Sequence, residues 1–351
     1  MGLIDNLQIG VKSLLAQQRA MEVVGHNIAN VNTPGYSKQK STLISSMPVL
    51  YNNLFFGTGV DLENIYQVRD RFIDYSILRE KQTKEGYDSS LKLSNIVDGI
   101  FVENDENGLN KAISSFFNSF HELSTNPESL TLRNGVITEA QKMVNIFRSR
   151  SQQLNDLQKV ADSEIDSYAN QINTITQQIA RLNEKISNSI ASNSQPNDLI
   201  DKRNILVEQL GELMSINVYE TDTRSMTIST KSGKSLVVGS EWFQVKSVRD
   251  PSNQNFHELY IYDNNTLRNV TDEITSGKIG GNLEMRDTLI PQYKKGLDDL
   301  AYAITTEVNS KHQAGYGLEG STGNMFFVPP AGVISDGEAA RMNVDSSVLS
   351  D

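Results

Sequence analysis

The sequence contains no cysteine, one tryptophan and only eight prolines among its 351 residues. Without cysteine there can be no disulfide, no cysteine-ligated zinc or iron–sulfur cluster and no thiolate nucleophile. Long apolar runs are also lacking, because no stretch approaches the roughly 18 apolar residues of a membrane span. The N-terminal segment MGLIDNLQIG has no signal-peptide pattern either. We therefore expect no membrane insertion and, at roughly 100–200 residues per domain, two or three domains.

Basic residues are in the minority. Lys and Arg number 32 against 43 Asp and Glu, which gives a formal net charge of −11 at pH 7. No basic stripe is long enough to neutralise a phosphate backbone, so nucleic acid is not an expected partner. The histidines, at positions 26, 121, 257 and 312, lie far apart and lack the spacing of a metal or acid–base motif. No catalytic residue, metal site or cofactor is predicted.

The N-terminal part is patterned as one long amphipathic helix followed by a different kind of segment. Over the first thirty residues, apolar residues recur at a spacing of three and four, which forms a narrow seam that needs a partner helix. Residues 31–68 are rich in Asn, Gly, Pro and β-forming residues, and we expect them to be extended or irregular. Helical periodicity returns over 70–100 and again over 109–123.

The clearest pattern is a heptad repeat of mainly isoleucine from Ile165 to Ile186. It predicts a rod-like helix over about 135–190, in a bundle or a coiled coil. The segment SNSQPND ends this helix, and the next helix is predicted over 199–213 with Asp198 as its N-cap.

Around Ser215 the period changes from 3.6 to 2. Short β-branched or aromatic segments then alternate with turn residues, which predicts a small antiparallel β-domain over 216–275. After Gly277, Gly280 and Gly281 a helical pattern resumes and runs to Val308.

These patterns together predict a mainly α fold, an elongated multidomain chain of long helices in a coiled-coil or bundle rod, with an inserted small antiparallel β-domain. The expected parts are a terminal coiled-coil helix and connector (1–36), the first part of a helical rod domain (37–214), the inserted β-domain (215–278), the return helix of the rod (279–320) and the start of a further region (321–351).

The end of the first helix carries an unusual set of polar residues. Asn27 and Asn30 can bond the carbonyls freed at the helix end or adopt a left-handed backbone. Thr33 and Gly35 frame a turn, and Tyr36 anchors the chain as it leaves that turn.

The pattern N-x-A-N-x-x-T-x-G-Y after an N-terminal heptad helix resembles the signature of the bacterial flagellar axial proteins, the rod, hook and hook-associated subunits. Three further segments resemble the hook-associated members of this family: LIDKRNILVEQLGEL at 199–213, GKIGGNLEMRDTLIPQY at 277–293, and the block at 297–327. No motif is assigned in the β-domain.

The resemblance implies a structural subunit and no enzyme. Such a subunit is secreted through the flagellar type III pathway without a cleaved signal peptide and assembles outside the cell, at the distal end of the hook, where it joins hook to filament. The implied partners are further copies in a ring, the hook protein on the proximal side, a second junction protein or the filament on the distal side, and the export apparatus.

The resemblance also assigns roles to residues. The assembly interface is expected at Leu7, Val11, Leu14, Met21 and Ile28, and the helix-ending connector at Asn27, Asn30, Thr33, Gly35 and Tyr36. The periodicity of the first set fits burial inside one subunit equally well.

Other interpretations remain open. The N-terminal motif also fits a hook or rod subunit, and the long helix over 135–190 fits a cytoplasmic coiled-coil adapter. A flagellum-linked wall hydrolase with a catalytic pair in the β-domain is a third. Family members end in a C-terminal helix with its own heptads, which this sequence lacks, so we expect the N-terminal part of a longer subunit.

Overall fold

A computed structural model describes residues 3–51, 53–103, 108–221, 224–263, 266–318, 320–330, 332 and 335–350, apart from the side chains of 3–5, 263 and 350. The chain forms two compact units. The first comprises Met1–Glu85, Tyr168–Val248 and Glu258–Gly277, and the second Gly86–Ser167, Arg249–His257 and Lys278–Asp351.

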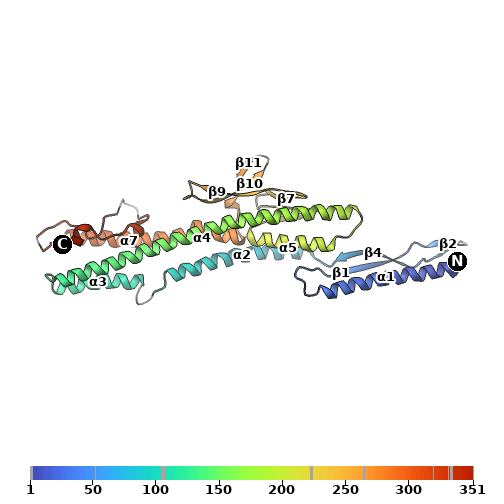
Figure 1. Cartoon of the computed structure of the whole chain (residues 1–351), viewed down its shortest axis with the longest axis horizontal. Coiled ribbons are helices and arrows are strands. Elements are labelled where there is room, and N and C mark those ends of the chain that lie inside the picture. Colours follow the sequence, from blue (N-terminus) through green and yellow to red (C-terminus); the bar gives the residue numbers. More distant parts are fainter. Residues whose placement is uncertain are drawn as a thin grey trace. The chain divides into compact units, whose positions relative to one another are not determined.

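In the first unit, helix α1 (Leu3–Ala29) lies along a β-hairpin made of β1 (Gln39–Ser45) and β4 (Val60–Gln67) (Figure 1). The two strands pair antiparallel, with a bulge at Thr42 and Leu43. A second, exposed hairpin of β2 (Val49–Tyr51) and β3 (Leu54–Phe56) is inserted between them. The segment expected to be extended or irregular is thus largely a pair of nested hairpins.

The core of the second unit lies among helices α2 (Arg71–Ile100), α3 (Leu109–Thr125), α4 (Leu130–Ala191) and α7 (Ile290–Gln313). Its centre is Phe116, whose ring contacts Phe120, Phe326 and Phe327 at centroid distances of 5.1–5.7 Å. The short helices α8 (Glu338–Arg341) and α9 (Ser346–Ser350) follow, and Ala339, Met342 and Val344 complete this core.

Helix α4 (Leu130–Ala191) ends directly before the segment SNSQPND, which is predicted to end it, and an asparagine of that segment lies in the left-handed region. Asn193 has φ +56°. Its N–H bonds the carbonyl of Ile190, and the N–H of Ser194 bonds that of Ser189, which is the Schellman arrangement. The following helix α5 (Asn197–Leu213) begins earlier than expected. Asp198 therefore lies in its first turn, and the prediction of Asp198 as N-cap is wrong.

The heptad of α4 is buried along a slightly different line from the expected one. Ile165, Ile172, Ile179 and Ile186 are fully buried, as the pattern requires. The alternate positions Tyr168, Ile175 and Leu182 are only half-buried, while Ala169, Thr176 and Asn183 are buried in their place. The reason is the partner: Asn183 donates hydrogen bonds to the carbonyls of Met226 and Gly239, so strands cover this face.

The strand region consists of two antiparallel sheets. The first has the order β5 (Asn217–Glu220), β6 (Met226–Ser229), β7 (Ser235–Val238), β8 (Glu241–Trp242). The second has the order β11 (Thr266–Asn269), β10 (Phe256–Asp263), β9 (Val245–Asp250). The predicted fold class, long helices with a small antiparallel β-region, is confirmed, whereas the five-part division stays a prediction.

The return to helix after the strands passes through a π-helical turn. A 3-10 turn (Thr271–Glu273) precedes α6 (Gly277–Glu284), the π-helical segment Met285–Leu289 follows, and α7 continues from it. Gly281 is required here because a Cβ at this position would overlap the carbonyl oxygen of Gly86 on α2. Gly281 of the 277–293 motif thus allows α6 to approach α2 closely.

Candidate functional site

Helix α1 presents two different apolar seams. Ala16 and Val23 are buried against the β1–β4 hairpin, and the same row contains the half-buried positions 9, 13, 20 and 27. The expected assembly residues form the other seam, which no described part of the chain covers; they are Leu7, Val11, Leu14, Met21 and Ile28. Leu14 is 71% exposed and Met21 72%.

The connector after α1 is fixed to strand β1 by the side chain of Asn27. Its amide nitrogen donates to the carbonyl of Gln39 at 2.8 Å, and its carbonyl oxygen accepts from the Gln39 N–H at 2.8 Å. The side chain thereby pairs with the backbone as a neighbouring strand would. Asn27 thus bonds the strand, and not a carbonyl of its own helix.

Tyr36 completes this arrangement from the other end of the connector. Its hydroxyl donates to the Asn27 side-chain oxygen at 2.8 Å and lies 3.0 Å from Nδ1 of His26. Partial burial and the negative charges of Asp198 and Asp201 raise the pKa of the Tyr36 hydroxyl, which keeps its proton available for donation.

The turn between them is held by Asn30, Thr33 and Gly35. The Asn30 side chain donates to the carbonyl of His26 at 3.0 Å, which also accepts the Asn30 backbone N–H, and the Thr33 hydroxyl donates to the Asn30 side-chain oxygen at 3.2 Å. Gly35 has φ +77°, and a Cβ there would overlap the side chain of Ile205 on α5. Asn30, Thr33, Gly35 and Tyr36 thus lie in the segment that follows α1, and the fifth predicted connector residue, Asn27, lies in the last turn of that helix.

Asp201 on α5 fixes the next part of the connector. Its carboxylate accepts from the Ser37 N–H at 2.9 Å and from the Ser37 hydroxyl at 2.5 Å. Arg69 lies 3.5 Å from the same carboxylate and pairs with Asp74 at 2.8 Å. Gln39 reaches Asp198 at 3.1 Å. The first turns of α5 therefore bind the segment that leaves α1.

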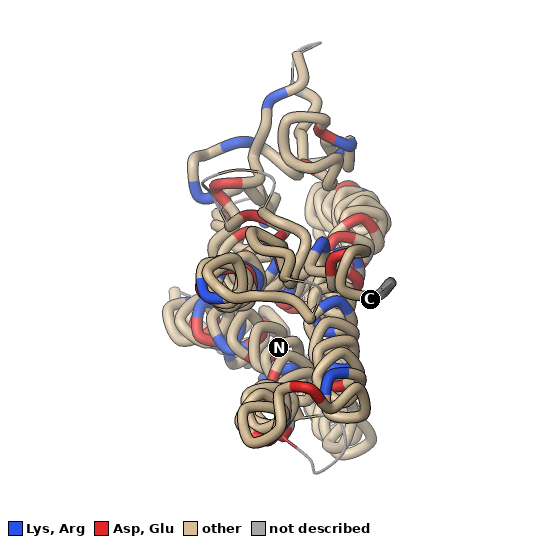
Figure 2. Tube along the Cα trace, turned by 90° about the vertical axis from the view of Figure 1, so that its left-hand side faces the viewer, with Lys and Arg blue, Asp and Glu red and all other residues tan. Residues whose placement is uncertain are grey.

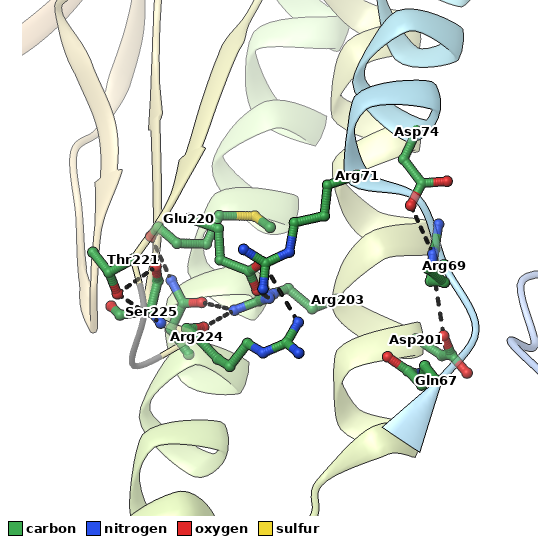
Figure 3. A network of polar contacts seen from close by, with 12 residues as sticks. Gln67, Arg69, Arg71, Asp74, Asp201, Arg203, Glu220, Thr221, Arg224 and Ser225 are labelled. Carbon is green, nitrogen blue, oxygen red and sulfur yellow. Dashed lines mark hydrogen bonds and ion pairs between the residues drawn. The ribbon is translucent and has the colours of Figure 1, made fainter. Parts of the chain in front are cut away.

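Arg203, two residues further along α5, is the centre of a buried polar network (Figure 3). Its guanidinium donates to Glu220 at 2.6 Å, to Asn183 at 2.8 Å and to the carbonyl of Arg224 at 2.6 Å. Burial lowers the pKa of Arg203, while the Glu220 carboxylate opposes that shift. Because the side chain is 0% exposed and paired with the 6% exposed Glu220, removing either partner would leave a buried charge.

The sequence motifs assign no role to Asp201, Arg203 or Glu220 individually. The first two lie in the segment 199–213 that carries the family resemblance, so a signal for them was present. Glu220 stands on a strand that carried no motif, and only the fold places it beside Arg203.

The second unit has comparable anchors at the other two segments of the resemblance. Asn309 accepts from the N–H groups of Phe326 and Phe327 and donates to the carbonyl of Phe327, all at 2.8–2.9 Å. Arg286, in the π-helical turn, pairs with Asp162 at 2.9 Å and donates to the carbonyl of His257 at 2.7 Å.

Among the described residues, no three His, Asp or Glu side chains are grouped so that they could hold a metal ion. None of the described helices combines the length and apolarity needed to cross a membrane. Figure 2 shows Lys and Arg positions interspersed with Asp and Glu positions along the described chain.

Most of the chain matches one known protein family. Residues 94–327 match the family described as flagellar hook-associated protein FlgK helical domain. The chain belongs to this family. The connector and the exposed seam lie in residues 7–36, which match the flagella basal body rod protein family.

Two curated relatives of this chain are named flagellar hook-associated protein 1. The one from Salmonella typhimurium is 28% identical over 321 residues, which cover 90% of this chain and 58% of the relative. The one from Escherichia coli is 29% identical over 338 residues, which cover 93% and 59%. The chain thus spans somewhat less than two thirds of the length of these relatives.

The fold also matches a solved structure, that of the flagellar hook junction protein FlgK from Burkholderia pseudomallei. The TM-score is 0.64 at 24% identity, over 72% of this chain and 46% of that one. At this identity the likeness concerns the fold.

Proposed function

We propose that this chain is a structural subunit of the bacterial flagellum that assembles at the distal end of the hook and joins the hook to the filament. The observation that carries the proposal is the match of 94–327 to the FlgK helical domain, together with relatives named flagellar hook-associated protein 1. The structural role of that family also argues against an enzyme.

The exposed seam of α1 supports assembly through the terminal helix. A row of large apolar side chains left in water is typical of a surface that another protein covers. The β2–β3 hairpin adds further exposed apolar residues, among them Tyr51, Leu54 and Phe55. We infer that Leu7, Val11, Leu14, Met21 and Ile28 contact neighbouring subunits, and that the connector fixes the direction in which α1 leaves the rest of the chain.

The proposal also specifies the export route and the binding partners. The chain is secreted through the flagellar type III pathway, forms a ring of its own copies, and contacts the hook protein on one side and a second junction protein or the filament on the other. A hook or rod subunit is the nearest alternative, since 7–36 match the rod family as well.

Deletion of the gene tests this function and separates it from that alternative. We expect the deletion strain to keep its hooks, to grow no filaments and to release flagellin into the medium, because the filament has no base on which to assemble. Electron microscopy and immunoblots of the culture supernatant are the measurements, and the wild-type gene supplied in trans is the control.

Two outcomes would contradict the proposal. Full-length filaments on the deletion strain would exclude a junction role. Loss of the hooks themselves would favour a hook or rod subunit, because those proteins are needed before any junction can form.

A further inference from the structure

Three guanidinium groups in the first unit converge on the single carboxylate of Glu220. Arg203 lies 2.6 Å from it, Arg71 3.2 Å and Arg224 3.8 Å (Figure 3). Glu220 and Arg203 are buried, whereas the side chains of Arg71 and Arg224 are 46% and 43% exposed. The charges of Glu220 and Arg203 cancel each other, and Arg71 and Arg224 add two further positive charges on the exposed side of this pair.

These two arginines line a pocket of about 190 Å³ between the end of β4, the start of α2, helix α5 and the β5–β6 turn. At the other end of the pocket the positive charge is balanced, because Arg69 is paired with Asp74 and with the buried Asp201. Glu208, on the same wall, pairs with Lys81 at 2.6 Å. The excess of positive charge is therefore confined to the end occupied by Arg71 and Arg224.

The backbone at Arg224 adds a second observation. Arg224 has φ +60°, a left-handed conformation that a non-glycine side chain rarely adopts. The bond from its N–H to the Thr221 carbonyl and the bond from Arg203 to its own carbonyl hold it there. Strained backbone of this kind persists where the surroundings impose it and is often found at ligand sites.

We propose that the pocket binds a small oxyanion, a carboxylate or a group of the size of sulfate or phosphate, between Arg71 and Arg224. Guanidinium groups bind such anions through paired N–H donors, and an anion here would offset the charge that Glu220 leaves uncompensated. A volume of 190 Å³ lies below the roughly 300–1,000 Å³ of pockets for drug-sized ligands, so the ligand is a single small group.

The test uses the full chain and three probes, sodium sulfate, sodium phosphate and sodium acetate, added at constant ionic strength against chloride. We expect a saturable rise of Tm and a saturable calorimetric signal with at least one probe. Arg71→Gln and Arg224→Gln should each weaken that binding by about tenfold or more, and Arg71→Lys should weaken it less, because it keeps the charge without the paired donors.

The matched control is Arg79→Gln. Arg79 is exposed on the same helix as Arg71 and does not line the pocket, so its binding curve should equal that of the wild type. Far-UV circular dichroism establishes that all variants remain folded, which is expected because neither Arg71 nor Arg224 is buried.

A second measurement separates a free anion from an acidic side chain as the ligand. If no probe binds saturably, but wild-type chains self-associate in sedimentation velocity and Arg71→Gln abolishes that association while Arg79→Gln keeps it, the anion is a carboxylate of a second copy. The proposal is overturned if both glutamine variants retain the anion response, or if there is neither anion binding nor association that depends on Arg71.

Discussion

Asparagine side chains join helices to extended backbone in both units of the chain. Asn27 pairs with Gln39, Asn173 pairs with Val245 through both of its side-chain atoms at 2.8 Å, and Asn309 pairs with Phe326 and Phe327. An amide suits this role because it places N–H donors beside a carbonyl acceptor in the geometry of a peptide group. An ionised carboxylate offers acceptors alone.

Replacement of Asn27 by aspartate tests this pairing. Asn27→Asp removes the donor to the Gln39 carbonyl and places a negative charge 2.8 Å from that oxygen. We expect the free energy of unfolding to fall by about 1–3 kcal/mol and amide exchange over 37–45 to become faster. Urea denaturation and hydrogen–deuterium exchange are the measurements.

Asn32→Asp is the matched control, because Asn32 is an exposed residue of the same connector and the change in charge is identical. We expect its stability to stay within about 0.5 kcal/mol of the wild type. Equal stability of the two aspartate variants would show that the Asn27 pairing contributes nothing.

The connector and the Arg203 network differ in how far the sequence could predict them. The amides, the turn and the glycine at 27–36 act over a few residues, so local rules for helix ends apply to them. Contacts between residues that are far apart in the sequence do not follow from such rules. Ser37 and Asp201 are separated by 164 residues, and Glu220 meets Arg203 only because β5 folds against α5.

At the scale of elements, hydrophobic periodicity predicted helices well and their partners less well. The repeat at Ile165, Ile172, Ile179 and Ile186 indicated a helix with one buried face, and this face is buried. A coiled-coil partner would also bury the alternate heptad positions Tyr168, Ile175 and Leu182. The actual partner includes strands with free carbonyl groups, so the polar Asn183 is buried instead.

Helix α1 carries a prediction of its own, because its exposed apolar seam has no partner in the described chain. Leu14→Asp places a charge in the middle of that seam. We expect the variant to be exported but absent from flagella, because burying an unpaired carboxylate in a subunit contact costs several kcal/mol. The expected phenotype is that of the deletion strain, measured by electron microscopy and by immunoblots of sheared flagella.

Leu15→Asp is the control for this variant. Leu15 is also exposed, but it lies at the edge of the seam, between Val11 and the charged face of α1 that carries Arg19. We expect normal filaments from it. If purified Leu14→Asp protein loses its helical circular-dichroism signal while the Leu15→Asp protein keeps it, Leu14 belongs to a core and not to an assembly surface.

At the scale of the whole molecule, each unit has a set of fully buried residues of its own. Phe116, Phe147 and Phe327 lie in the second unit, and Ile228, Leu236 and Val237 lie on strands of the first. Helix α4 contributes to both. The presence of two cores bears on stability, because regions with separate cores can unfold separately and then show separate protection against hydrogen exchange.

Two core truncations test whether the units unfold independently. Phe116→Ala should cost about 3–5 kcal/mol and Ile228→Ala about 2–5 kcal/mol, because each removes a side chain with 0% exposure. Hydrogen–deuterium exchange should then become faster over 86–125 and 290–313 in the first variant, and over 217–238 in the second. Each variant serves as the control for the other. Faster exchange of all these segments in both variants would mean that one cooperative unit includes both cores, with α4 transmitting the loss of packing between them.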